Sequence, residues 1–141
     1  MMGPSRFDES VFDDGLHAVR ADGPVLLVTR SSKEFEDVGA LQNGADGLRT
    51  ALAGRPRSST ALVIDLRQAR GRTDPAFEEV WAPLRRELFS SWAAVAVICQ
   101  TQVGRMHVQR HMRQDGLDWH VVVDEAEAFA HARDAVQSTM R

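Results

Sequence analysis

The chain has 141 residues, of which 43% are hydrophobic, so it is large enough for one globular domain with a buried core. Its 17 basic and 20 acidic residues give a formal net charge of −3, which disfavours nucleic-acid binding, because such domains usually carry a basic surface. The one cysteine, Cys99, excludes an internal disulfide. No segment approaches the roughly 20 apolar residues of a membrane-spanning helix, and the first residues lack the apolar centre of a signal peptide. We therefore expect a cytoplasmic protein that does not insert into membranes.

The N-terminal half of the chain predicts two strands and a helix. Residues 1–14 have no periodic pattern and are expected to form a tail before a single domain that covers residues 15–141. We expect a short edge strand at residues 16–20 and a buried strand at the apolar, β-branched residues 25–29. A helix is expected from residue 31 or 32 to residue 52. Its three glycines each weaken it by up to about 1 kcal/mol relative to alanine, so this segment is a candidate for a break into two pieces.

The C-terminal half alternates strands with helices. The remaining strands are expected at residues 61–66, 93–99 and 119–123, and the remaining helices from residue 74, over residues 103–115 and over residues 125–136. Asp74 and Pro75 mark a helix start, since aspartate is a common N-cap and proline is favoured at the first helical position. Pro83 is expected to kink that helix, and Gly116 to end the next one. Strands that alternate with helices predict an α/β fold with a four- to five-stranded, mainly parallel sheet.

Charged and polar residues follow the strand at residues 61–66, whose carboxyl end is where α/β domains usually hold their functional groups. The candidate site for a partner protein or an anion consists of Asp65, Arg67, Arg70, Arg72, Thr73 and Asp74. The arginines lie close to a predicted helix N-terminus, which itself favours anions, so the loop could hold a phosphate, a nucleotide or an acidic protein surface. The alternative is a solvated loop whose arginines pair with nearby carboxylates.

The order of these elements resembles the STAS domain of anti-sigma-factor antagonists, in its SpoIIAA-like bacterial branch. The strand Val63-Ile64-Asp65-Leu66, with a helix opening after it, carries the resemblance, which covers about residues 15–138. In that family an Asp-Ser pair lies at the start of this helix, and a partner kinase that is also the anti-sigma factor phosphorylates the serine. An ungapped count from Asp65 places the pair on Thr73 and Asp74.

Asp74 departs from the family pattern, because an aspartate cannot be phosphorylated. It either supplies a fixed negative charge where relatives switch one on, or marks a site that has lost the switch, and it is also an ordinary helix cap. Thr73 beside it is a candidate phosphosite. The resemblance implies a non-catalytic regulatory module of a bacterial signalling pathway. Such a module docks to a kinase or a similar regulatory protein, or to another copy of itself.

Two other functions compete with this interpretation. The first is a small-ligand, lipid-like carrier or sensor, since lipid-transfer domains of the CRAL-TRIO kind are similar in shape to this branch. The second is a small enzyme that uses His107, His111 or Asp65. The histidines lie on one predicted helix with Asp115 in the same row, but three groups on one side of a helix give poor tetrahedral metal geometry. No serine lies in a Gly-x-Ser-x-Gly turn, and no glycine-rich phosphate loop follows a strand. We therefore expect no enzyme activity, no metal and no cofactor.

Overall fold

The computed structural model describes residues 7–69 and 74–139 of the chain. Within these ranges six strands form one sheet, in the order β1-β2-β3-β4-β5-β6. The strands are β1 (Glu9–Asp13), β2 (His17–Asp22), β3 (Val25–Arg30), β4 (Ala61–Asp65), β5 (Ala94–Ile98) and β6 (His120–Val122). β1, β2 and β3 pair antiparallel, whereas β3, β4, β5 and β6 are parallel neighbours. The predicted α/β fold with a mainly parallel sheet is confirmed, with six strands in place of four or five.

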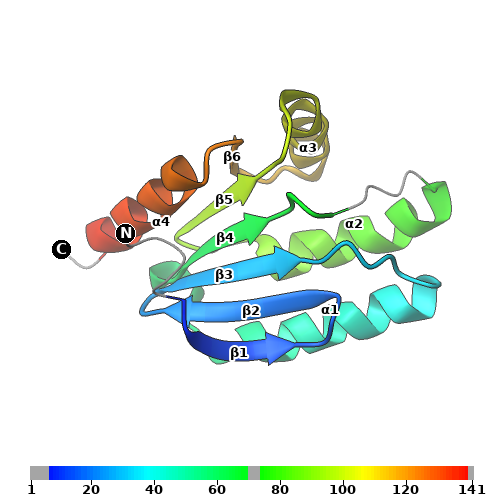
Figure 1. The fold of residues 1–141 in the computed structure, drawn as a ribbon, viewed down its shortest axis with the longest axis horizontal. Helices are drawn as coiled ribbons and strands as arrows, with labels where there is room; N and C mark the ends of the chain where they lie inside the picture. The colour runs from blue at the N-terminus through cyan, green and yellow to red at the C-terminus, as the bar shows by residue number, and fades with distance from the viewer. Residues whose placement is uncertain (1–6, 70–73, 140–141) are drawn as a thin grey trace.

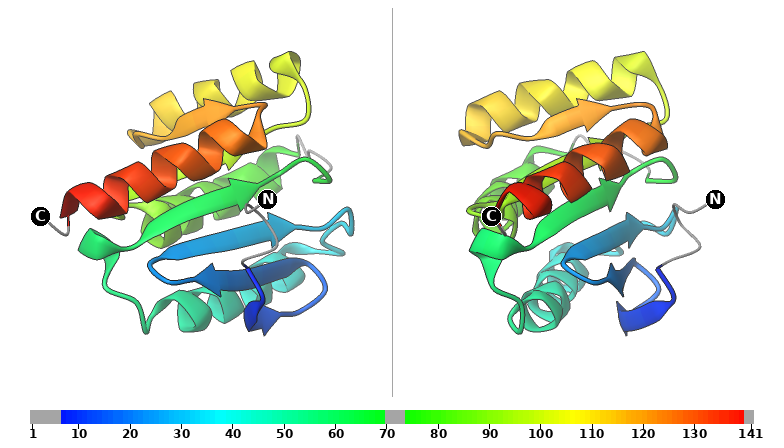
Figure 2. Two further views of the ribbon diagram at one scale, coloured as in Figure 1. Left: turned by 60° about the vertical axis from the view of Figure 1, so that its left-hand side comes forward. Right: turned by 90° about the vertical axis from the view of Figure 1, so that its left-hand side faces the viewer.

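Helices cover both faces of this sheet (Figures 1 and 2). They are α1 (Val38–Leu52), α2 (Pro75–Phe89), α3 (Gln102–Asp115) and α4 (Glu125–Thr139), and a 3-10 turn, η2 (Arg57–Ser59), precedes β4. α1 and α2 pack on one face, where Leu48 and Leu88 are fully buried. α4 covers the other face with Phe129 and Ala132. β4 and β5 lie between the two layers, which explains why their sequences are apolar almost without interruption.

The first strand lies inside residues 1–14, so part of the expected tail belongs to the sheet. β1 forms a hairpin with β2 around Asp14 and Gly15, and Gly15 has a φ of +84°, which glycine adopts without strain. The Asp14 carboxylate accepts hydrogen bonds from the backbone N–H groups of Leu16 and His17. An irregular register within β1 replaces the alternation of apolar and polar residues that would have revealed a strand.

Helix α1 begins at Val38 rather than at residue 31 or 32. Asp37 is its N-cap, and the Asp37 side chain accepts a hydrogen bond from the backbone N–H of Ala40. The preceding residues form a loop that places the Phe35 ring near the ring of Phe77, with 6.4 Å between the centroids. The glycines do not break α1 into two pieces, and the loop before it supplies part of the pocket described below.

Gly47 allows α1 and β1 to lie in close contact. A Cβ atom at Gly47 would lie 2.6 Å from Cζ of Phe12, so the Phe12 ring of β1 occupies the space of the missing side chain. A glycine inside a helix costs up to about 1 kcal/mol relative to alanine. Here that cost permits an aromatic ring of the edge strand to pack directly on the helix backbone.

The start of α2 and the end of α3 lie where the sequence predicts them. Asp74 is the N-cap of α2, Pro75 is its first residue, and Gly116 follows α3 in the left-handed region with a φ of +70°. α2 continues as one helix through Pro83, whose side chain is exposed. The proline therefore does not end the helix, although it has no N–H with which to form the hydrogen bond of that turn.

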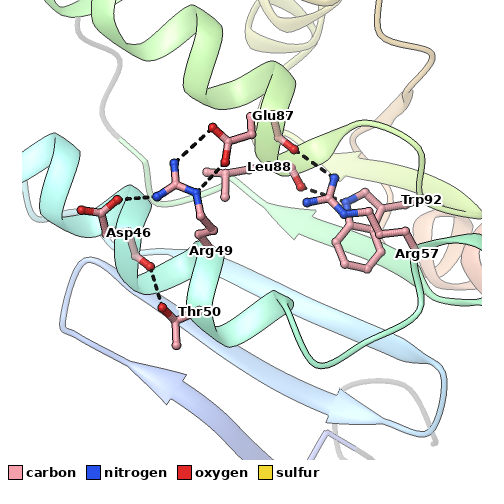
Figure 3. Close-up of polar contacts among 7 residues, drawn as sticks. All are labelled: Asp46, Arg49, Thr50, Arg57, Glu87, Leu88 and Trp92. Carbon is pink, nitrogen blue, oxygen red and sulfur yellow. Dashed lines mark hydrogen bonds and ion pairs between the residues drawn. The ribbon is translucent and has the colours of Figure 1, made fainter.

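Two arginines, one in α1 and one in η2, form hydrogen bonds with α2 (Figure 3). Arg49 of α1 donates a hydrogen bond to the carboxylate of Glu87 at 2.5 Å. Arg57 of η2 donates to the backbone carbonyl oxygens of Glu87 and Ser90 at the end of α2, and its guanidinium lies 4.8 Å from the ring centroid of Trp92. Carbonyl groups at a helix end lack partners within the helix, so the contacts of Arg57 stabilise the end of α2.

Candidate functional site

Asp65 and Arg67, two members of the candidate anion site, pair with each other. The Arg67 side chain donates to both carboxylate oxygens of Asp65, at 3.0 and 2.8 Å, and lies 3.4 Å from the Glu125 carboxylate at the start of α4. Burial alone would raise the pKa of Asp65, but hydrogen bonds from the Arg67 side chain and backbone hold this pKa below its ordinary value. Arg67 thus links the end of β4 to α4, which is the pairing that the solvated-loop alternative predicts for it.

Asp74 lies at the other end of the loop and caps α2. Its carboxylate accepts a hydrogen bond from the backbone N–H of Ala76 at 3.0 Å, so the ordinary capping role is confirmed. Arg70, Arg72 and Thr73 lie outside the described residues. The proposed phosphosite at Thr73 and the anion-binding role of the two arginines therefore stay predictions.

A pocket of about 250 Å³ lies beside the carboxyl ends of β3 and β4, on the face of the sheet that α1 and α2 cover. Most of its wall is apolar. The apolar lining consists of Val28, Phe35, Leu41, Ile64, Leu66, Ala69, Phe77, Trp81, Phe89, Val108, Met112 and Trp119. Leu66 and Ala69 belong to the segment after β4, so the pocket borders the strand-to-helix junction in which the sequence predicts a site. A concave apolar pocket with a few polar groups is the usual form of a small-molecule site.

Helix α3 closes one side of the pocket with a narrow apolar stripe. Val108 and Met112, the two residues of this stripe, are half-buried and pack against the core on the α1 and α2 side. No residue of α3 is fully buried. α3 is therefore held on the protein by fewer buried apolar side chains than α1 and α2 are.

Three buried nitrogen atoms on the pocket wall have no hydrogen-bond partner among the described residues. They are Nδ1 of His17, Nδ1 of His111 and Nε1 of Trp119. His111 Nδ1 is 3.5 Å from a carboxylate oxygen of Glu78, a separation at which no hydrogen bond forms here. A buried polar atom left unpaired costs about 1–3 kcal/mol, so residues around the pocket carry polar groups that the described part of the protein does not satisfy.

Both of these histidines are held in the neutral form. The pKa of His17 is lowered from 6.5 to about 4, mainly by burial and in smaller part by the charge of Arg30, while the charge of Asp14 opposes the shift. Burial also lowers the pKa of His111, although Glu78 opposes that change. The two imidazoles are therefore polar but uncharged groups near neutral pH, and each ring can donate or accept according to its tautomer.

Arg85 is bound by two carboxylates. Its Nε donates to Asp115 at 2.6 Å and its Nη2 donates to Glu78 at 2.7 Å, which joins α2 to the last residue of α3. The Arg85 side chain is 9% exposed and that of Asp115 is 4% exposed. The positive charge of Arg85 is therefore already neutralised inside the protein, and Arg85 serves to hold α3 in place.

Arg30 has no ion-pair partner among the described residues. Its Nη1 donates to the backbone carbonyl oxygens of Leu16 and Ser31, and its guanidinium lies 4.5 Å from the ring centroid of Phe35. Burial lowers the pKa of Arg30, and the charges of Asp14 and Glu34 only partly oppose this. The pocket thus contains one cation, Arg30, whose charge is balanced by backbone carbonyl groups and by the charges of Asp14 and Glu34, without an ion pair to any described residue.

His107 and His111 are neighbours, as their spacing predicts. Their Nε2 atoms lie 3.2 Å apart, and both residues border the pocket. The described part of the chain contains no group of three or more histidine, cysteine, aspartate or glutamate side chains placed to hold a metal ion. Likewise, none of the described helices combines the length and the apolar character needed to cross a bilayer.

A second hollow, beside β6, is lined mainly by polar atoms. Arg105 is among its lining residues and donates a hydrogen bond to the backbone carbonyl oxygen of Val121. Val121 belongs to the edge strand β6, so Arg105 provides a partner for a carbonyl group at the edge of the sheet. Its accessible lining is more polar than apolar, so it would exclude water from a ligand less well than the apolar pocket. The apolar pocket is therefore the stronger candidate for a functional site.

Comparison with known proteins supports the fold. No protein-family model and no curated protein matches the sequence. Among solved structures, the chain is similar to an uncharacterized protein of the DUF3478 family with a SpoIIAA-like fold, from Shewanella loihica PV-4. The two chains share 19% sequence identity, the match covers 86% of this chain and 98% of the other, and the TM-score is 0.56. At this level of identity the likeness concerns the fold, and the chain is thereby identified as a domain with a SpoIIAA-like α/β fold.

Proposed function

We propose that this chain is a non-catalytic domain that binds a small apolar or amphipathic molecule, as a carrier or a sensor. The observation that supports this most directly is the 250 Å³ pocket, whose walls are apolar and hold three unpartnered buried nitrogen atoms. Apolar walls favour an apolar ligand, and a few polar atoms among them fix its orientation. The resemblance of this branch to lipid-transfer domains in shape points in the same direction.

Ala69 offers a way to test the proposal by filling the pocket. This half-buried residue lines the pocket from the loop after β4. We expect the wild-type chain to bind the neutral fluorophore N-phenyl-1-naphthylamine saturably with one site, and Ala69→Phe to weaken this binding at least about tenfold, because the new ring occupies the pocket. Fluorescence titration measures both. Native mass spectrometry of the purified wild-type chain would add support if it showed a bound small molecule.

The matched control is Ala130→Phe, which adds the same ring at an exposed position of α4, on the opposite face of the sheet. This variant should bind the fluorophore as the wild type does. A wild-type chain that shows no saturable binding, or an Ala69→Phe variant that binds as tightly as Ala130→Phe, would contradict a ligand-binding role for this pocket.

A second candidate function is docking to a regulatory protein of a bacterial signalling pathway, as the STAS resemblance implies. The observation that favours it is on α3, where Val103 is 78% exposed and Met106 is 61% exposed. Large apolar side chains exposed on a helix are typical of protein contacts. This surface differs from the junction at Asp65–Asp74, where Arg67 is already paired within the chain.

A pull-down with the full chain as bait distinguishes the two docking surfaces. If α3 is the contact, the double change Val103→Ser and Met106→Ser should remove a specific partner that the wild type retains, while Arg70→Ala with Arg72→Ala should leave the partner bound. The reverse pattern would favour the junction. A partner that survives both double changes would argue against docking at either surface.

A further inference from the structure

We propose that the pocket selects a molecule with an apolar chain and a carboxylate head, and that Arg30 and His17 bind the carboxylate while the apolar wall encloses the chain. This inference rests on the ligand-binding function proposed above and specifies the class of ligand. Arg30 is at the end of β3 and His17 at the start of β2, opposite each other in the antiparallel register, so two neighbouring strands present both groups to the pocket.

Arg30 is the pocket cation that can accept an anionic partner. Arg85, the other arginine on the wall, already holds Asp115 and Glu78, whereas Arg30 forms no ion pair with any described residue. The guanidinium of Arg30 uses Nη1 for two backbone carbonyl oxygens, and no described residue accepts a hydrogen bond from its Nε or Nη2. A carboxylate can bind these two donors side by side, which is the geometry that makes arginine–carboxylate pairs strong.

His17 supplies a neutral hydrogen-bond donor beside this cation. The His17 side chain is 7% exposed, and its Nδ1 atom is buried without a partner. Nδ1 lies on the side of Gly44 in α1, so the ring nitrogen that a carboxylate in the pocket could reach is Nε2, which would donate a hydrogen bond in the tautomer that carries the proton there. Binding would therefore neutralise a half-buried charge and add a hydrogen bond from a neutral ring, whereas an uncharged head group would leave the charge of Arg30 as it is.

The aromatic and aliphatic wall determines the rest of the molecule. Phe35 packs under the Arg30 guanidinium and continues the wall toward Phe77 and Trp81, so an apolar chain attached to the carboxylate would lie against rings. Two carboxylates share this wall. The charge of Glu78 is taken up by Arg85, so Glu78 opposes an incoming anion less than a free carboxylate would. Glu34 forms no ion pair with a described residue, and its charge favours the cationic form of Arg30, so an incoming carboxylate has to compete with Glu34 for this cation. The pocket therefore has a positively charged end and an apolar body.

A pair of isosteric probes tests this selectivity. Nonanoate and decan-2-one share the same alkyl chain and differ only in that a methyl group replaces one carboxylate oxygen. We expect isothermal titration calorimetry at neutral pH to show nonanoate binding about ten- to hundredfold more tightly than decan-2-one to the wild-type chain, as charge-assisted hydrogen bonds to a guanidinium provide. Arg30→Met should remove most of this preference and change the affinity for decan-2-one by less than about threefold.

Two further variants test whether the preference for nonanoate depends on the guanidinium geometry of Arg30 and on its position in the pocket. Arg30→Lys keeps the positive charge but cannot form the bidentate pair of hydrogen bonds with a carboxylate. Its affinity for nonanoate should therefore lie between those of the wild type and Arg30→Met. Arg113→Met removes one charge from an exposed position of α3 that does not line the pocket, and should leave both affinities unchanged. The decan-2-one affinity of each variant reports whether the pocket is intact.

The possible outcomes separate this inference from the proposed function. If nonanoate and decan-2-one bind equally well to the wild type, or if Arg30→Met weakens both alike, the carboxylate inference is overturned and the pocket is still a ligand site. If neither probe binds and N-phenyl-1-naphthylamine does not bind either, the ligand-binding function itself is overturned.

Discussion

Replacing Arg85 by methionine is expected to lower the free energy of unfolding by about 3 kcal/mol, because it leaves the buried carboxylate of Asp115 without its main partner. Arg85 Nε is 2.6 Å from Asp115, whose side chain is 4% exposed. Burial alone would lower the pKa of Arg85, but hydrogen bonds to Asp115 and Glu78 outweigh it and raise the pKa. Urea denaturation measures the loss as a lower midpoint with an unchanged slope.

Arg86→Met is the matched control for this prediction. Arg86 also approaches Asp115, but at 3.4 Å and with a side chain that is 48% exposed, so its removal should cost less than about 1 kcal/mol. Adding Asp115→Leu to Arg85→Met should restore much of the stability, because the unpaired buried charge is then gone. Equal losses from Arg85→Met and Arg86→Met would show that burial of the pair does not determine its contribution.

The same substitution should loosen α3. No residue of α3 is fully buried, so the ion pair between α2 and the last residue of α3 supplies part of what keeps this helix over the pocket. Amide hydrogen exchange in α3 should therefore accelerate in Arg85→Met more than exchange in α1. This effect links the stability of the fold to the pocket, because Val108 and Met112 of α3 form one of its walls.

The sequence predicts the central part of the fold because local signals agree there. The strands β3, β4 and β5 are short apolar runs, and α2 and α3 have clear caps at Asp74 and Gly116. The edge strand β1 was not predicted, because its pairing is decided by the hairpin with β2 and by Phe12 packing on Gly47, and neither contact is visible in a local pattern. Gly47, one of the three glycines expected to weaken α1, is the residue that permits this contact.

The pocket could not be predicted from the sequence for a related reason. Its polar groups, His17, Arg30, His111 and Trp119, come from distant positions and have no fixed spacing. The junction from Asp65 to Asp74 is visible in the sequence because its charged residues are close together in the chain. There Arg67 is paired and Asp74 is a cap, whereas the unpaired groups lie in the adjacent pocket. The one available signal was that His17 alternates with Val19 and Ala21, which places a polar residue on the buried face of β2.

His17 should make the wild-type protein less stable as the pH falls from about 6.5 to about 4. Its pKa is about 4 in the folded chain, because burial and the charge of Arg30 disfavour the imidazolium, against an ordinary value of 6.5. Between these two values the unfolded chain binds a proton that the folded chain does not, so stability increases with pH across this window. The full shift corresponds to about 3 kcal/mol.

The variant His17→Gln isolates this contribution, since glutamine is uncharged at every pH and of similar size. The difference in the free energy of unfolding between wild type and variant should fall by about 3 kcal/mol as the pH decreases from 7 to 4, whatever its value at pH 7. The carboxylates that titrate in the same range are common to both proteins and cancel in the difference. A difference that stays constant with pH would mean that His17 accepts a proton in the folded chain. That result would also bear on the pocket, because a His17 imidazolium beside Arg30 would place two positive charges at the end where we propose a carboxylate binds.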